Sequence, residues 1–253
     1  MAFELFDFKN QPITFGDLDN KAFWCRHGEK QEEAFIKAFT SLQQQKRVKS
    51  DEILAIHPSK HSNPYHPDLI INNQFIGEVK TKNSPLFMAN TYGINPQFAL
   101  TMDLKDSFNY ERLLNNGTDI TIYIWVKWEA MIMKTKYNQY RVKQLAGVWR
   151  TPFSTLREHE LKSPPPIHWY KEPFRKPPEY SVSDEQHNVW VNELINFEPR
   201  LLDHNSYSVK NITSKGYSND KNQLYTSGHS SCSYVFDLSN SDVFTELYSN
   251  VLR

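Results

Sequence analysis

The chain has 253 residues, of which 39% are hydrophobic and 23% are charged, a composition typical of globular proteins. Its 29 Lys and Arg residues equal its 29 Asp and Glu residues, so any binding to nucleic acid must depend on local charge. No run of about 18 apolar residues occurs, which excludes a transmembrane helix. With two cysteines and an N-terminal segment unlike a signal peptide, the chain is expected to be cytoplasmic.

The first predicted element is a helix over residues 28–42. Phe35 and Phe39 lie four positions apart and define one apolar face. Glu32 precedes them by three and seven positions, so its side chain is predicted to point with that face. Glu33 is about 100° further round the helix and is predicted to point towards solvent.

The following segments alternate between strand and helix patterns. Short apolar runs on either side of the polar residues 72–74 predict a hairpin. The predicted strands cover residues 53–56, 68–71, 75–80, 119–126 and 233–237, and the other predicted helices cover residues 96–114, 148–161 and 242–248.

Composition changes after residue 162. Six of the 15 residues from 164 to 178 are proline, which predicts an extended connection rather than a helix or a central strand. A polar region rich in Asn and Ser follows. We therefore expect a compact α/β core over residues 1–162 and a C-terminal appendage over 163–253 that packs on it.

The predicted hairpin brings two acidic residues together. A three-residue loop at 72–74 pairs Ile71 with Phe75, and the same register places Asp68 directly opposite Glu78. Like charges opposed in a sheet are destabilising, and a divalent cation between the two carboxylates would remove the repulsion. Such hard oxygen ligands suit Mg²⁺, with Mn²⁺ as a substitute.

Lys80 lies two residues after Glu78 and therefore on the same face of the predicted strand. Its ammonium group could orient or deprotonate a metal-bound water, or stabilise a pentacovalent phosphate. The metal would lower the pKa of the water and offset negative charge on the phosphate. These groups suffice to hydrolyse a phosphodiester. The alternative is an exposed hairpin with an ordinary Glu–Lys surface pair.

Pro67-Asp68 and Glu78-Val79-Lys80, separated by nine residues, resemble the motif of the PD-(D/E)XK nuclease superfamily. That superfamily includes many type II restriction endonucleases, resolvases and repair nucleases. The resemblance covers residues 25–160. It implies a restriction-endonuclease-like α/β fold, in which a mixed central β-sheet is flanked by helices and carries the motif on a β-hairpin.

The resemblance also implies roles for individual residues. Asp68 and Glu78 would be metal ligands, the backbone carbonyl of Val79 a further ligand, and Lys80 the catalytic lysine. A glutamate on the preceding helix often contributes to such sites, and Glu32 matches it. The implied activity is that of a Mg²⁺-dependent endodeoxyribonuclease.

Size and the single catalytic core look similar to type II restriction enzymes, so site-specific cleavage of double-stranded DNA by a homodimer is the favoured form. One alternative is a repair, recombination or phage-type nuclease of the same fold. The other is a non-catalytic DNA-binding protein that retains a nuclease-like core.

Residues 130–157 carry six basic and no acidic residues, with aromatic residues between them. This pattern predicts a phosphate-binding surface, and the alternative is a solvated edge balanced by distant acids. A proline-rich segment further on is either a DNA-contacting loop or a linker packed on the core. The predicted DNA-binding residues are Lys82, Lys134, Lys136, Arg141, Lys143, Arg150, Arg157, Arg175 and Lys176.

Two other metal sites are alternatives. A structural zinc site would use Cys25, His27, His229 and Cys232, although the two halves lie some 200 residues apart. The closely spaced His57, His61 and His66 are either transition-metal ligands or histidines satisfied without a metal.

Overall fold

The computed structural model describes most of the chain. The described residues are 3–13, 21–48, 50–63, 66–169, 184–203, 217–218, 224–225 and 232–251, with the side chains of residues 21–29, 184, 186–187, 190, 203, 217–218 and 224–225 left out. No helix in these ranges is long and apolar enough to cross a lipid bilayer.

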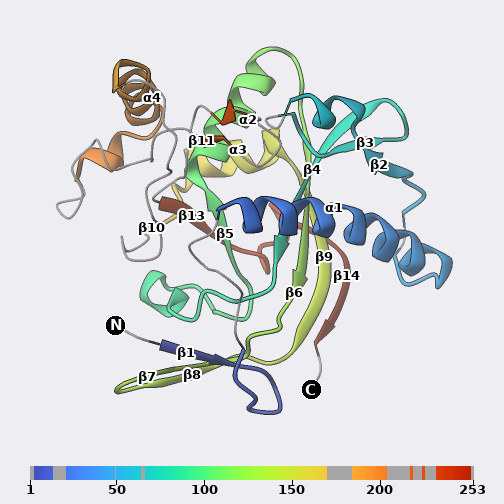
Figure 1. Ribbon diagram of the computed structural model, residues 1–253, viewed down its shortest axis with the longest axis vertical. Coiled ribbons are helices and arrows are strands. Elements are labelled where there is room, and N and C mark those ends of the chain that lie inside the picture. The colour runs from blue at the N-terminus through green and yellow to red at the C-terminus, as the bar shows by residue number, and fades with distance from the viewer. Residues whose placement is uncertain are drawn as a thin grey trace.

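A six-stranded mixed sheet forms the centre of the fold (Figure 1). Its strand order is β14-β9-β6-β4-β3-β2, and only β4 and β6 run parallel to each other. The strands are β2 (Leu54–Ile56), β3 (Leu69–Ile71), β4 (Phe75–Lys82), β6 (Thr121–Lys127), β9 (Leu145–Pro152) and β14 (Thr245–Val251). A parallel pair needs a crossover connection, and the residues between β4 and β6 supply it.

Helix α1 (Lys21–Gln44) covers one face of this sheet (Figure 1). Phe35 and Phe39 are fully buried, and both rings contact Tyr123 of β6, with centroid distances of 5.7 and 5.9 Å. Val79 of β4 joins the same cluster. The predicted apolar face of the helix is therefore the face that packs on the sheet.

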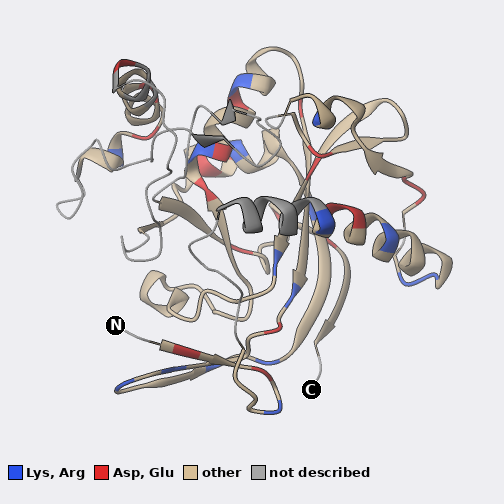
Figure 2. Cartoon of the chain, in the orientation of Figure 1, with Lys and Arg blue, Asp and Glu red and all other residues tan. Residues whose placement is uncertain are grey.

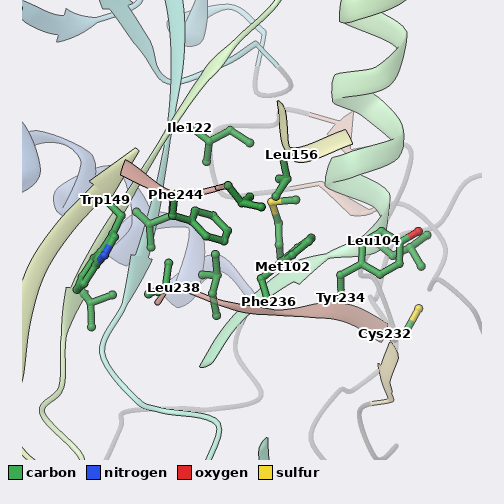
Figure 3. Close-up of a cluster of buried hydrophobic side chains, with 14 of the residues drawn as sticks. Met102, Leu104, Ile122, Trp149, Leu156, Cys232, Tyr234, Phe236, Leu238 and Phe244 are labelled. Atoms are coloured by element: carbon green, nitrogen blue, oxygen red, sulfur yellow. The ribbon is translucent and has the colours of Figure 1, made fainter. Parts of the chain in front are cut away.

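Helices α2 (Leu104–Asn115) and α3 (Phe153–Lys162) cover the opposite face. Alternate residues of β6, such as Ile122, point into this second cluster, while Tyr123 points towards α1. Figure 3 shows Ile122 packed near Leu156 and Phe244 in this larger core. The two faces of β4 are thus buried under different helices, with Glu78 and Lys80 on the side of α2.

Smaller sheets and one further helix surround this centre. One antiparallel sheet contains β1 (Phe3–Phe6), β7 (Ile132–Thr135) and β8 (Gln139–Arg141), and another contains β10 (Ile167–Trp169), β13 (Cys232–Asp237) and β5 (Ala99–Asp103). The pair β11 (Tyr217–Ser218) and β12 (Leu224–Tyr225), helix α4 (Asp184–Phe197) and the 3-10 turns η1 (Pro58–His61), η2 (Ala89–Tyr92) and η4 (Pro199–Asp203) complete the described elements.

The α/β fold with a mixed central sheet between helices is confirmed, but one predicted helix is wrong and two others are wrong in part. Residues 245–251 form β14, which pairs with β9, so the predicted helix at 242–248 does not exist. The predicted helix at 96–114 is divided between β5 and α2. The predicted helix at 148–161 begins only at Phe153, after Pro152 has ended β9.

Two strands of the C-terminal region pair with strands from the first 162 residues. β13 pairs with β5, and β14 is an edge strand of the central sheet. These two strands form because they pair with strands far away in the sequence. The local pattern of residues 242–248 contains no information about such pairing.

Candidate active site

The β3–β4 hairpin has the register that the sequence predicted. Leu69 pairs with Gly77 and Ile71 pairs with Phe75, which leaves a three-residue loop. Asn72 and Asn73 in that loop have φ angles of 52° and 56°, a left-handed conformation that asparagine tolerates better than most residues. One pair beyond Leu69 and Gly77, this register sets Asp68 opposite Glu78.

Asp68 and Glu78 are tied together across the hairpin by main-chain hydrogen bonds. The Val79 N–H donates to Asp68 Oδ2 at 3.0 Å, and the Asp68 N–H donates to Glu78 Oε2 at 3.2 Å. Only 3% of Asp68 is exposed. The backbone of each strand therefore fixes the carboxylate of the other, which brings the two acids into one site.

Helix α2 contributes two residues to this site. Glu78 Oε1 accepts hydrogen bonds from Lys80 Nζ at 2.9 Å and from the Tyr110 hydroxyl at 2.7 Å. Lys80 Nζ also donates to Asp106 Oδ2 at 2.8 Å. Asp106 and Tyr110 are four residues apart and so lie on one face of α2. They hold Glu78 and Lys80 in place from that side.

Lys60 of η1 enters the site from the side of Asp68. Its ammonium group donates a hydrogen bond to Asp68 Oδ1 and lies 3.8 Å from Glu32 Oε1. The turn that carries it is capped by His57, whose Nδ1 accepts a hydrogen bond from the Ser59 N–H at 3.1 Å.

Glu32 of α1 faces the site, as its helical position predicted. Its side chain is 15% exposed, whereas its neighbour Glu33 is exposed to solvent. Burial, together with the negative charge of Asp68, raises the pKa of Glu32 to about 8, against the opposing effect of Lys60. A carboxyl group with this pKa is mostly protonated at neutral pH.

The charges of the site also shift the pKa of Glu78 and of Lys80. Burial and the charge of Asp68 raise the pKa of Glu78, and the two lysines Lys80 and Lys60 only partly oppose this. Burial lowers the pKa of Lys80, but the carboxylates of Asp106 and Glu78 outweigh it and leave the pKa well above its ordinary value. Lys80 is therefore a cation at neutral pH.

Lys82, the next same-face residue on β4, has a different environment. Its ammonium group donates to Thr101 Oγ1 at 3.2 Å. Burial lowers the pKa of Lys82, and the nearby charge of Asp103 only partly opposes this.

The donor chemistry of the site suits a hard divalent cation, because carboxylate oxygens from Glu32, Asp68 and Glu78 converge there. Among the described residues, however, no group of three or more His, Cys, Asp or Glu side chains is arranged as a set of metal ligands. Lys60 and Lys80 lie on the carboxylates instead. The lysines thus supply the counter-charge that the sequence assigned to a metal.

The six predicted DNA-binding cations of residues 130–157 divide into two groups. Lys134 and Arg141 lie on the β7–β8 hairpin, Lys136 lies in its loop and Lys143 follows it. Figure 2 shows the Lys and Arg positions of the chain in blue. Lys134 Nζ is 4.1 Å from the centroid of the Phe6 ring and donates to Asn10 Oδ1 at 3.2 Å. Tyr137 in the loop is 74% exposed, and Lys136 and Arg141 are exposed as well, so this hairpin presents cations and an aromatic ring to solvent.

Arg150 and Arg157 instead form ion pairs within the fold. Arg150 Nη1 lies 2.6 Å from Glu52 Oε1. Arg157 bonds to Glu111 at 2.8 Å and to Glu160 at 2.9 Å. For these two residues the structure matches the alternative in which distant acids balance the charge, and their DNA contact stays a prediction. Arg175 and Lys176 lie outside the described residues.

The other predicted metal sites gain no support from the described residues. The rings of His57 and His66 stack with centroids 3.8 Å apart. Cys232 is buried in β13. The side chains of Cys25 and His27, and the whole of His229, lie outside the described residues, so the zinc site stays a prediction.

Three residues of the site were not predicted. Asp106 and Tyr110 carry a weak signal in the sequence, since they share one face of α2, the first α-helix after the motif. Lys60 carries none, because it stands in a polar segment with no periodic pattern.

Comparisons of the chain with protein-family models, with curated proteins and with solved structures gave no match. No family is shown. The function is inferred from the site itself.

Proposed function

We propose that the protein is a Mg²⁺-dependent endodeoxyribonuclease of the PD-(D/E)XK type. The observation that carries the proposal is the convergence of Asp68, Glu78 and Lys80 at one end of a hairpin, with Glu32 beside them from α1. A surface hairpin with an ordinary Glu–Lys pair would leave these groups in solvent. Here the charged groups are largely buried and bonded to one another, an arrangement that is costly for folding and typical of functional sites.

The arrangement of elements also supports the proposal. Helix α1 precedes the β2–β3–β4 meander, α2 follows it, and β6 then runs parallel to β4. The motif therefore lies on a hairpin of a mixed sheet flanked by helices, which is the setting that the resemblance implies. The likeness is one of architecture, and the site residues carry the functional argument.

Asp68 and Glu78 would hold the metal ion, with the main-chain carbonyl of Val79 as a further ligand. When bound, Mg²⁺ supplies a water of lowered pKa and offsets charge on the scissile phosphate. Tyr110 orients Glu78 through its hydroxyl group. Glu32 completes the acidic side of the site.

Lys80 acts as a cation in this proposal. Because Asp106 and Glu78 keep its pKa well above the ordinary value, its ammonium group is suited to stabilise negative charge on the phosphate. This favours charge stabilisation over deprotonation of the attacking water, the two roles between which the sequence did not decide.

The substrate would be double-stranded DNA, and the favoured form of the reaction is site-specific double-strand cleavage of the type II restriction kind. Since one site cuts one strand, a homodimer would cut both. The exposed cations of the β7–β8 hairpin would bind phosphates. They give affinity, and base recognition would come from other side chains.

The proposal is tested by incubating the purified protein with plasmid DNA and Mg²⁺, and again with EDTA. Asp68→Ala and Lys80→Ala should abolish Mg²⁺-dependent cleavage. Matched controls are Asp242→Ala and Lys127→Ala, because both side chains are exposed and outside the site, and these variants should cut like the parent. Equal cleavage by Asp68→Ala and the parent would refute the proposal.

The products of this assay also separate the related functions. Discrete fragments indicate restriction, with Mn²⁺ expected to replace Mg²⁺. Smeared products or cleavage confined to branched DNA indicate a repair, recombination or phage-type nuclease. Metal-independent DNA binding with no cleavage of any substrate indicates a non-catalytic DNA-binding protein.

A further inference from the structure

Lys60 lies outside the Asp-Glu-Lys motif but inside the acidic site. It belongs to η1, and its ammonium group donates a hydrogen bond to Asp68 Oδ1. The same ammonium group is 3.8 Å from Glu32 Oε1. Lys60 therefore bridges a carboxylate of the motif and the carboxylate from α1.

The acidic residues of the site stabilise the protonated form of Lys60. Burial by itself lowers the pKa of Lys60, but the carboxylates of Asp68, Glu78 and Glu32 outweigh it and raise the pKa above its ordinary value. Lys60 is thus a permanent cation among three acidic groups.

Lys80 does not duplicate this role. Its ammonium group is bonded to Glu78 and Asp106, on the side of α2. The ammonium group of Lys60, in contrast, pairs with Asp68 and lies 3.8 Å from Glu32. The two lysines divide the carboxylates of the site between them.

We propose that Lys60 is a built-in counter-ion that competes with the divalent metal ion for Asp68 and so sets the metal affinity of the site. This inference rests on the proposed function, because it takes Asp68 as a metal ligand. Lys60 is a positioning residue in this role. Its positive charge also offsets the repulsion between the buried carboxylates, because like charges at short range repel.

The direction of the effect follows from charge alone. Replacing Lys60 with methionine keeps an unbranched side chain of similar length but removes a positive charge next to a metal ligand. The acidic site becomes more negative by one charge, and a divalent cation no longer has to displace an ammonium group. Both changes strengthen metal binding, and we expect an affinity gain of about tenfold or more.

The test measures Mn²⁺ binding without DNA, by titrating each purified protein and following free Mn²⁺ by electron paramagnetic resonance. Lys60→Met should bind at least about tenfold more tightly than the parent. Lys60→Arg, the charge-preserving control, should stay close to the parent. Asp68→Ala should lose the binding in either background. Lys60→Gln is a second neutral variant should Lys60→Met fail to fold, which circular dichroism reports.

The outcomes distinguish this inference from the proposed function. If Asp68-dependent Mn²⁺ binding is present and Lys60→Met and Lys60→Gln bind no more tightly than the parent, the inference is wrong and the metal site stands. If neither the parent nor the neutral variants show Asp68-dependent binding, the proposed metal site fails and the inference fails with it. Binding that appears only in the neutral variants supports the inference in its strongest form.

Discussion

Asp106 and Lys80 form an ion pair in which Lys80 Nζ lies 2.8 Å from Asp106 Oδ2. Lys80 belongs to the hairpin that carries the motif, and Asp106 belongs to the first turn of α2. The same ammonium group bonds to Glu78 at 2.9 Å, so Lys80 is held between two carboxylates. Helix α2, which lies in the connection between the parallel strands β4 and β6, therefore also orients the side chain of Lys80.

Asp106→Asn is expected to lower kcat for DNA cleavage by about tenfold to a hundredfold. The variant keeps the shape of the side chain but removes its negative charge. Lys80 is then left with Glu78 as its one charged partner of the two, and its ammonium group is no longer held between two carboxylates. KM should change little, because Asp106 is not proposed to contact DNA. Cleavage rates at several DNA concentrations separate the two constants. Asp242→Asn, at an exposed position, is the matched control, and an unchanged kcat for Asp106→Asn would contradict the positioning role.

Glu32→Gln is expected to change how stability depends on pH. The folded-state pKa of Glu32 is raised to about 8 from 4.5, so the folded protein holds this proton more tightly than the unfolded chain. The stability that Glu32 contributes is present at low pH and is lost as pH rises from about 4.5 to about 8. Relative to the parent, Glu32→Gln should gain about 3.5 kcal/mol of unfolding free energy between pH 5 and pH 8.

Urea unfolding in EDTA at pH 5, 6.5 and 8 measures this effect. Glu33→Gln is the matched control, because Glu33 is the next residue of the same helix and is exposed. Its stability should follow that of the parent at all three pH values. Parallel pH profiles for Glu32→Gln and the parent would show that Glu32 has no raised pKa in the folded protein.

The parts of the site that the sequence predicted depend on local periodicity. The loop length fixed the register that sets Asp68 opposite Glu78, because side chains alternate along a strand. The helical repeat distinguished Glu32 from Glu33 in the same way. Both predictions needed only residues close together in sequence.

The parts that the sequence did not predict depend on contacts between distant segments. Asp106 lies 26 residues from Lys80, and the partner of Arg150, Glu52, lies 98 residues away. No local pattern contains such pairs. For the same reason residues 245–251 were predicted as part of a helix, although pairing with β9 makes them a strand.

Lys136→Ala is expected to weaken DNA binding and to leave the fold intact. Lys136 lies in the loop of the β7–β8 hairpin, beside the exposed ring of Tyr137. If it contacts one phosphate, its loss should reduce the slope of log K against log salt concentration by about 0.9. Binding assays from 50 to 200 mM salt with catalytically inactive Asp68→Ala as the background measure this slope. A slope equal to that of the Asp68→Ala background would place the hairpin outside the DNA-binding surface.

Arg157→Ala is expected to destabilise the fold by about 3 kcal/mol rather than to weaken DNA binding directly. The guanidinium group bonds to Glu111 and Glu160 and lies 4.2 Å from the centroid of the Phe197 ring. It therefore joins α2, α3 and α4. Removing it leaves the carboxylate of Glu160, which is only 3% exposed, without its cation.

The double variant Arg157→Ala/Glu160→Gln tests this cause. Glu160 also accepts a hydrogen bond from Ser107 at 2.8 Å, which a neutral amide oxygen can still accept. If an uncompensated buried charge accounts for most of the loss, replacing that charge should restore about half of the lost unfolding free energy, measured by urea denaturation. A double variant no more stable than Arg157→Ala would instead assign the loss to the packing of Arg157 against Phe197.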